Sequence, residues 1–243
     1  MNIGYFGANL GAFDNPDSIE RLATTAESAG FESIWTGEHV VLVDPQVAPS
    51  PVPPHAPFVD TIATLAFLAA KTKTLKIGSG IILLAQRQPV VLAKELAGID
   101  VLSKGRLLFG VGVGYVEGEF DALGIPYAER GARVTEHIEV IRTLWTEEQP
   151  SFDGAFTKFA GIQSRPQPVQ SPHPPIHVGG MSAPALRRAV AQGDGWYGFF
   201  QDLDATATAL KGLEEAAKRV ERPASLGKLE ITVTLPGHDD ANT

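Results

Sequence analysis

The sequence predicts an α/β fold in which parallel strands alternate with helices, and three observations support this prediction. Short apolar runs alternate along the chain with segments whose apolar residues recur at helical spacing. The length of 243 residues is close to the roughly 250 residues of a (β/α)8 barrel. Glycines or a polar pair close several of the apolar runs, at Gly37-Glu38-His39, Gly78-Ser79-Gly80, Gly110-Val111-Gly112-Val113-Gly114 and Gly179-Gly180. Because parallel strands place their carboxyl ends at one edge, we expect these loops to form a ligand site there.

Composition excludes several classes of protein. The formal net charge is -8 and no basic run occurs, which argues against a nucleic-acid-binding surface. There is no cysteine, so disulfides, thiolate metal sites and thiol catalysis are excluded. The longest apolar stretches, at 62–70 and 77–85, are shorter than the roughly 20 residues of a membrane span, and the first residues do not resemble a secretion signal. We expect one soluble, cytoplasmic domain over residues 1–243 that binds neither nucleic acid nor membrane.

The first two strand and helix units are defined by apolar runs and punctuating residues. A strand is expected at 3–8, followed by a helix that opens near Asp17 or Ser18, where apolar residues take up helical spacing, and ends at Gly30. The second strand, 33–36, leads through a proline-rich loop at 45–57 into a helix at 59–70. Loops of this length in compact domains are often lids or binding elements, and this loop follows Glu38-His39.

The third and fourth units follow the same order. A strand at 75–83 is nearly all apolar, which suits a strand covered on both faces, and a helix follows at 89–102. The fourth strand, 106–111, passes into the glycine string, an irregular stretch and a long helix at 131–145 with one apolar face. Residues 147–175 break the pattern, so we expect an insertion there with a small hairpin at 152–156.

The rest of the chain supplies fewer elements than a closed barrel requires. Strands are expected at 176–178, 196–199 and 229–235, with helices at 183–192 and 205–220. This makes seven strands, whereas eight close the fold, so the prediction is a TIM (β/α)8-type barrel lacking the last β/α unit, with an insertion at about 147–175. A strand overlooked in the insertion, a truncated chain and a partner subunit over the open edge are the three explanations. Since open edges expose apolar surface, we favour the last two and expect a homodimer.

Six segments, taken in order, resemble the luciferase-like monooxygenase family, and most of all its coenzyme F420-dependent oxidoreductases. They are Ser33-Ile34-Trp35-Thr36-Gly37-Glu38-His39, Ile77-Gly78-Ser79-Gly80-Ile81, Gly105-Arg106-Leu107-Leu108-Phe109-Gly110-Val111-Gly112, Arg130-Gly131-Ala132-Arg133 with Glu136, Ile176-His177-Val178-Gly179-Gly180 and Gly193-Asp194-Gly195-Trp196. The resemblance implies an oxidoreductase that transfers a hydride between a 5-deazaflavin and a small organic substrate. Two alternatives are an FMN-dependent monooxygenase of the same family and a non-catalytic barrel that binds flavin.

The resemblance also implies three catalytic candidates. In this family a histidine at the position of His39 lies beside the cofactor ring as a proton donor or substrate contact, which suits an imidazole; the alternative is a histidine that only binds a loop. The neighbouring Glu38 either takes part or only orients that histidine. Several relatives place an acid directly after the glycine string, where this chain has Tyr115. A hydroxyl at Tyr115, or the carboxylate of Glu117 or Glu119, could take that role.

Cofactor contacts are expected at two places. Relatives carry a non-proline cis peptide at the end of the third strand, where a bulge presses on the ring, and the matching bond joins Gly80 to Ile81; the alternative is an ordinary strand with glycines for tight packing. Gly112 belongs to a turn that packs near the ring in the family. The second place precedes the helix at 183–192 and consists of Gly179, Gly180, Met181 and Ser182.

The segment from Gly179 to Ser182 has the properties of a phosphate site. Free backbone N–H groups and the positive end of a helix attract phosphate, and a serine hydroxyl adds a donor. The alternative is a helix that Ser182 merely caps. No histidine or acidic spacing matches a metal motif, so no metal is predicted.

Overall fold

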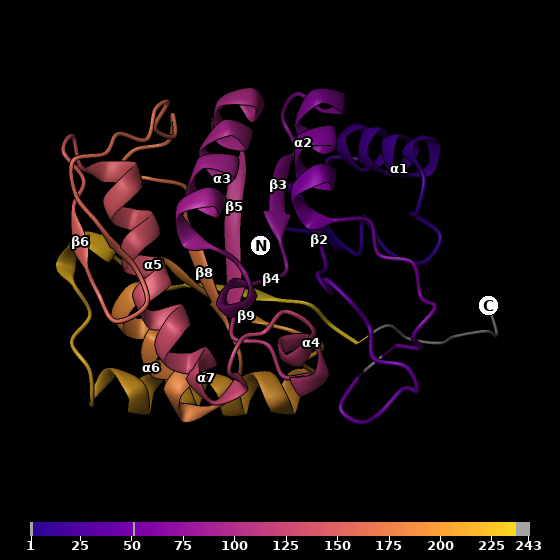
Figure 1. Cartoon of the computed structure of the whole chain (residues 1–243). Helices are drawn as coiled ribbons and strands as arrows, with labels where there is room; N and C mark the ends of the chain where they lie inside the picture. Colours follow the sequence, from indigo (N-terminus) through magenta and orange to yellow (C-terminus); the bar gives the residue numbers. More distant parts are fainter. Residues whose placement is uncertain (1, 51, 237–243) are drawn as a thin grey trace. The chain divides into compact units, whose positions relative to one another are not determined.

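Parallel strands alternating with helices make up the computed structural model, which describes residues 2–50 and 52–236 (Figure 1). The chain divides into two compact units, Met1–Pro174 and Pro175–Thr243, and the single domain over residues 1–243 stays a prediction. All seven strands expected from the sequence are found among the described residues. Within the same residues, every helix is too short or too polar to cross a bilayer.

The sheet of the first unit is parallel throughout. Its order is β1-β2-β3-β5, and β4 also pairs with β5. Every residue of β2 and β5 is buried, as expected for strands covered on both faces. The bounds are β1 Gly4–Phe6, β2 Ser33–Thr36, β3 Lys76–Ser79, β4 Ile82–Leu83 and β5 Leu107–Gly112.

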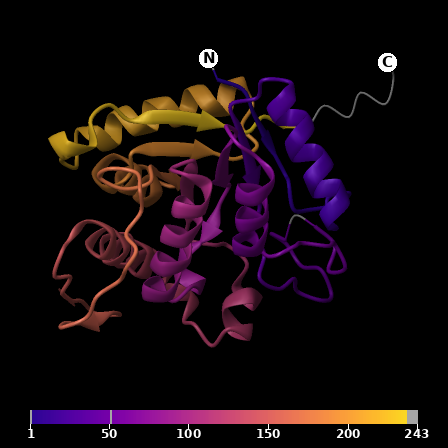
Figure 2. The same ribbon diagram turned by 90° about the horizontal axis from the view of Figure 1, so that it is seen from above.

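Five helices belong to the described part of the first unit. They are α1 Pro16–Ser28, α2 Thr61–Lys71, α3 Pro89–Ser103, α4 Glu117–Ala122 and α5 Arg130–Thr146, with 3-10 turns η1 Leu84–Gln86 and η2 Tyr127–Glu129. Side chains cap the first three, because Asn15, Asp60 and Gln88 each accept a bond from the N–H three residues on. The helices α2 and α3 lie side by side, and α5 packs on α3 (Figure 2).

Two local predictions for this unit were wrong. The strand expected over 75–83 is broken into β3 and β4 at a cis peptide bond between Gly80 and Ile81. The stretch before η2 was expected to be irregular but contains α4. The predicted hairpin is confirmed, because β6 Phe152–Asp153 and β7 Lys158–Phe159 pair antiparallel in the insertion.

Over residues 175–236, the second unit contains three parallel strands and two helices. Its elements are β8 Ile176–Gly179, α6 Ala183–Gln192, β9 Gly195–Gly198, α7 Leu203–Ala217, the 3-10 turn η3 Ala224–Leu226 and β10 Glu230–Val233. Strand β9 pairs with both β8 and β10. The two helices pack so closely that a methyl group at Gly212 would lie 2.5 Å from Leu186 Cδ1.

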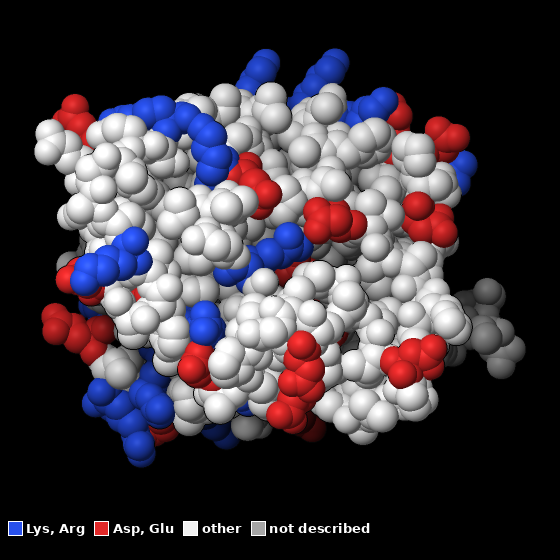
Figure 3. All heavy atoms as spheres, viewed as in Figure 1, with Lys and Arg blue, Asp and Glu red and all other residues white. Residues whose placement is uncertain are grey.

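On the face drawn in Figure 3, basic and acidic side chains are scattered over a mostly uncharged surface. That part of the described protein therefore has no extended basic patch of the kind that nucleic acids require.

The segment that joins β3 to β4 leaves no room for a side chain at Gly110 or Gly112. A Cβ atom at position 110 would lie 1.9 Å from the backbone oxygen of Ser79. A Cβ atom at position 112 would lie 2.0 Å from Ile81 Cδ1. The Ser79 hydroxyl closes the contact, since it donates to the Gly110 carbonyl at 2.8 Å and accepts from the Gly110 N–H at 2.9 Å. Close packing alone therefore requires glycine at both positions.

Glu27 ties the end of α1 to the chain that enters β3. Its Oε1 accepts bonds from the N–H groups of Lys73, Thr74 and Leu75 at 2.6 to 2.9 Å and from the Thr74 hydroxyl at 3.0 Å. Burial acts to raise the pKa of Glu27, but these bonds outweigh it and lower that pKa from 4.5 to about 2. The ionised carboxylate therefore stabilises the fold.

The stability losses caused by Gly110→Ala and Gly112→Ala should respond differently to a second substitution, Ile81→Val. Gly110→Ala meets backbone that cannot move aside, so we expect a loss of stability of about 3 kcal/mol or more. Gly112→Ala meets only a terminal methyl group, so Ile81→Val, which removes that methyl group, should restore most of its loss. Urea unfolding of the four variants tests this. Gly98→Ala, in open space on α3, is the control and should stabilise by about 0.5–1 kcal/mol. Equal rescue of both glycine variants by Ile81→Val would contradict the account.

Acid should remove the contribution of Glu27. Because its folded pKa is lowered, the stabilisation is complete above its ordinary pKa of 4.5 and is lost as the pH falls toward about 2. Glu27→Gln should therefore lower the urea midpoint at neutral pH, and the difference from the unsubstituted protein should shrink toward about pH 3. Glu20→Gln on the same helix removes only an exposed ion pair with Lys71 and serves as the control. If the difference in urea midpoint between Glu27→Gln and the unsubstituted protein does not change with pH, the role of the ionised Glu27 carboxylate is contradicted.

Candidate functional site

The imidazole of His39, in the loop after β2, contacts the carboxylate of Glu119 on α4. The distance from His39 Nδ1 to Glu119 Oε1 is 2.5 Å, and the two side chains are 9% and 1% exposed. Because a carboxylate only accepts hydrogen bonds, this contact assigns the ring proton to Nδ1. The other nitrogen, Nε2, makes no hydrogen bond to the described residues. Of the three residues named for the missing acid, the structure brings Glu119 to His39.

Other side chains complete the surroundings of this pair. Gln86 Nε2 donates to Glu119 Oε2 at 3.0 Å. The rings of Phe58 and Tyr115 lie edge to face with the His39 ring, at centroid distances of 5.2 and 6.3 Å. Burial, and then the charge of Glu119, raises the pKa of the Tyr115 hydroxyl, which keeps it a donor at neutral pH. Sequence reasoning missed Gln86 and Phe58, because neither belongs to a motif.

Helix α4 is positioned by packing around its ends. Phe120 is fully buried and its ring lies 5.2 Å from that of Tyr127 in η2. A Cβ atom at Gly118 would lie 2.5 Å from Val43 Cγ1, so α4 closely approaches the loop that follows His39. The tyrosine hydroxyl of Tyr127 donates to the Tyr115 carbonyl at 3.2 Å. These contacts set the distance between Glu119 and His39.

Glu38 is engaged differently from its neighbour. Its carboxylate forms an ion pair with Arg87 and accepts a bond from the Leu83 N–H at 2.5 Å. Arg87 also contacts Asp60 Oδ2 at 3.0 Å. Burial raises the pKa of Glu38, although the charge of Arg87 opposes this shift. No hydrogen bond joins Glu38 to His39 in the described part of the chain, so Glu38 links the end of β2 to β4 and η1.

The cis peptide implied at Gly80 and Ile81 is confirmed. The N–H of Gly80 donates to the Thr36 carbonyl at 2.7 Å, at the end of β2. Gly112 lies against Ile81, as the glycine contacts of β5 show. A cofactor contact at Gly80, Ile81 or Gly112 stays a prediction.

In the second unit, the turn from Gly179 to Ser182 joins β8 to α6. Gly180 has a φ angle of +112°, which favours glycine, and its carbonyl accepts a bond from Trp196 Nε1 at 2.9 Å. The Ser182 hydroxyl accepts from the Ala185 N–H at 3.4 Å, so it caps the helix as the structural alternative required. Phosphate binding by this turn stays a prediction.

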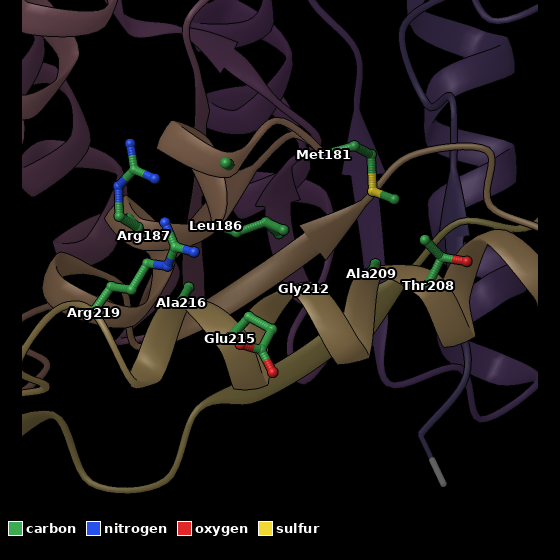
Figure 4. Close-up of a pocket in the computed structure, with 10 residues that line it drawn as sticks. Met181, Leu186, Arg187, Thr208, Ala209, Gly212, Glu215, Ala216 and Arg219 are labelled. Carbon is green, nitrogen blue, oxygen red and sulfur yellow. The ribbon is translucent and has the colours of Figure 1, made fainter.

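A pocket of about 320 Å³ lies between α6 and α7 (Figure 4). Met181 of the turn and Ala183 after it line the pocket, and Arg187 and Arg219 bring two guanidinium groups to it. Neither guanidinium forms an ion pair with the described residues. Positive charge beside the turn attracts anions.

Across residues 2–50 and 52–236, no three histidine or acidic side chains gather as metal ligands would.

Comparison with known proteins places these features in a family context. The profile of the luciferase-like monooxygenase family matches residues 4–240. An uncharacterized protein of Mycobacterium tuberculosis is 31% identical over 209 residues, which cover 82% of this chain and 74% of that protein. The oxygenase component of flavin-dependent trigonelline monooxygenase from Acinetobacter baylyi is 32% identical over 179 residues, 73% of this chain and 46% of that protein.

A solved structure extends the comparison to three dimensions. The F420-dependent secondary alcohol dehydrogenase bound to an F420–acetone adduct superposes with a TM-score of 0.77 at 21% identity, over 95% of this chain and 68% of that one. This likeness confirms the predicted fold class, a mixed α/β fold of the TIM-barrel type.

If Glu38 is held by its ion pair, Arg87→Met should be strongly destabilising. The substitution leaves a buried carboxylate without its cation, which costs about 3–5 kcal/mol. Glu38→Gln removes that charge and keeps an acceptor for the Leu83 N–H, so the double variant should recover a large part of the loss. Urea unfolding of both single variants and the double variant measures the coupling. Additive losses would show that the two side chains act independently.

Proposed function

Because the chain belongs to the luciferase-like monooxygenase family, we propose that it is an oxidoreductase that transfers a hydride between the 5-deazaflavin coenzyme F420 and a small organic substrate. The observation that supports this most is the pairing of His39 with Glu119, which leaves Nε2 without an internal partner. A proton accompanies hydride transfer to a carbonyl group or from an alcohol. An imidazole with one free nitrogen can supply or accept that proton near neutral pH.

Two groups of residues are proposed to hold the cofactor. Gly80, Ile81 and Gly112 are proposed to contact the ring, and the turn from Gly179 through Gly180 and Met181 to Ser182 its phosphate. The turn suits such a group because it lies at the positive end of α6, and the nearby Arg187 and Arg219 form no ion pair with the described residues. When bound, a deazaflavin supplies the hydride chemistry.

The chain itself manages the proton and the surroundings. His39 holds or releases a proton at Nε2, and Glu119 keeps the proton on Nδ1 and stabilises the charged ring. Phe58 and Tyr115 cover the imidazole and limit the access of water. The Tyr115 hydroxyl remains a neutral donor beside the pair. We place Glu38 with this group as a residue that fixes the loop of His39 through Arg87 and Leu83.

A second candidate is an FMN-dependent monooxygenase. The relative that favours it is the flavin-dependent trigonelline monooxygenase component, at 32% identity over 73% of this chain. A non-catalytic barrel that binds flavin is the third alternative. A homodimer and a cytoplasmic location stay predictions of the sequence.

Cofactor titration and replacement of His39 test the proposal. We expect coenzyme F420 to bind more tightly than FMN when ligand fluorescence is followed. With a panel of small alcohols and ketones, His39→Ala should lower turnover by about 10²- to 10⁴-fold, the usual size of general acid or base catalysis, and leave cofactor affinity nearly unchanged. The control is His55→Ala, an exposed histidine of the loop before α2, which should keep full turnover.

Two results would overturn the proposal. Exclusive binding of FMN with oxygen consumption by the reduced protein would favour the second candidate. Full turnover by His39→Ala with F420 would remove His39 from the mechanism.

A further inference from the structure

The amide of Gln86 is buried, and its orientation is set by Glu119. The residue ends η1 and is 8% exposed. Its Nε2 donates to Glu119 Oε2 at 3.0 Å. A carboxylate cannot donate, so the NH2 group of the amide must face Glu119. The amide oxygen, Oε1, then points elsewhere and is buried without a hydrogen-bond partner among the described residues.

An unpartnered buried oxygen is unfavourable for folding. The free energy lost when such a group leaves water is not recovered by packing. The methylene groups of a methionine could fill the same space without this loss. Packing therefore does not explain an amide at position 86, and its bond to the buried Glu119 Oε2 is the contact that remains to explain it.

Each oxygen of Glu119 has one donor. Oε1 contacts His39 Nδ1 at 2.5 Å and Oε2 accepts from Gln86 at 3.0 Å. The charged and titratable groups around the carboxylate are His39 from the loop after β2 and Tyr115 from the loop before α4, whose hydroxyl experiences the charge of Glu119. With both oxygens occupied, the plane of the carboxylate is fixed. Without Gln86, only the His39 bond would orient it.

We propose that Gln86 is a positioning residue that holds the Glu119 carboxylate in the orientation that keeps the proton of His39 on Nδ1 and its Nε2 free. Its importance for turnover rests on the proposed function, whereas its effect on the imidazole does not. Gln86 contacts neither reacting group in this scheme and acts through Glu119.

Nitrogen NMR of the protein labelled with ¹⁵N-histidine measures the proton position directly, without cofactor. At about pH 8 the imidazole of an ordinary histidine is neutral and the tautomers are distinguishable. We expect the His39 signal, assigned by its loss in His39→Asn, to report the Nδ1–H tautomer. In Gln86→Met it should move toward a mixture of both tautomers. Gln163→Met, which removes an exposed amide bound to the Glu148 carbonyl, is the control and should leave it unchanged.

Thermal unfolding separates positioning from structural support. Gln86→Met removes an unsatisfied oxygen but also the one donor to the buried Glu119 Oε2, so its Tm should fall only modestly. A lower Tm with an unchanged His39 signal would overturn the inference and make Gln86 a packing residue. Gln86→Glu gives an independent readout if the methionine variant does not fold. This variant is read together with Gln86→Leu, which removes the donor to Glu119 Oε2 without adding a carboxyl group and should also mix the tautomers; an unchanged signal in Gln86→Leu overturns the inference.

Turnover measurements separate the positioning role of Gln86 from the proposed use of His39 in turnover. With F420 and an alcohol or ketone substrate, Gln86→Met should lower kcat about tenfold or more while KM changes little, because no substrate contact is removed. A shifted tautomer with unchanged kcat would support the positioning role and contradict the proposed use of His39 in turnover. An unchanged tautomer overturns the positioning role whatever the activity.

Discussion

The close approach of the segment Ser79–Ile81 to β5 is the constraint on which the rest of the first unit depends. Positions 110 and 112 have no room for a Cβ atom, since the Ser79 carbonyl and the Ile81 side chain already occupy that space. The segment is thereby held between β2, through the Thr36 carbonyl, and β5. Everything that follows it in the chain, β4 and then η1, starts from this fixed point.

From that point a series of contacts leads to His39. Shortly after the segment, the Leu83 N–H donates to the Glu38 carboxylate. Gln86, at the end of η1, donates to the Glu119 carboxylate. Glu119 in turn contacts the imidazole. The adjacent residues Glu38 and His39 thus have separate partners. Arg87 and Leu83 hold Glu38 in a structural contact, whereas Glu119 binds His39 Nδ1 and leaves Nε2 without a partner among the described residues. The close packing between the two strands therefore helps to fix the position of the His39 imidazole, a group that can accept or release a proton.

The regular elements were largely predictable because their signals are local. Helical spacing and a capping serine placed α6 over Ala183–Gln192 as observed, and the apolar runs located every strand to within a few residues. Helix α4 was missed, because Glu117–Ala122 contains two acids and a glycine and has little apolar periodicity. Its stability comes from tertiary contacts, namely the buried ring of Phe120 and the bonds of Glu119 to His39 and Gln86. Within the glycine string, contacts with Ser79 and Ile81 are sufficient to require glycine at positions 110 and 112.

The site was predictable only in part, because tertiary contacts bring its residues together. Motif order pointed to His39 and named Glu119 among three candidates with Tyr115 and Glu117, but His39 and Glu119 are 80 residues apart in sequence. Spacing along the chain cannot pair residues that tertiary packing alone brings together. Gln86 carried no signal at all, since a single glutamine after an apolar strand is unremarkable in composition and periodicity.

A crystal structure of the protein with coenzyme F420 and a substrate analogue tests the central claim most directly. We expect His39 Nε2 within hydrogen-bond distance, about 3 Å, of the bound analogue, with the cofactor ring against Ile81. A ring bound elsewhere, with Nε2 facing only water, would contradict it.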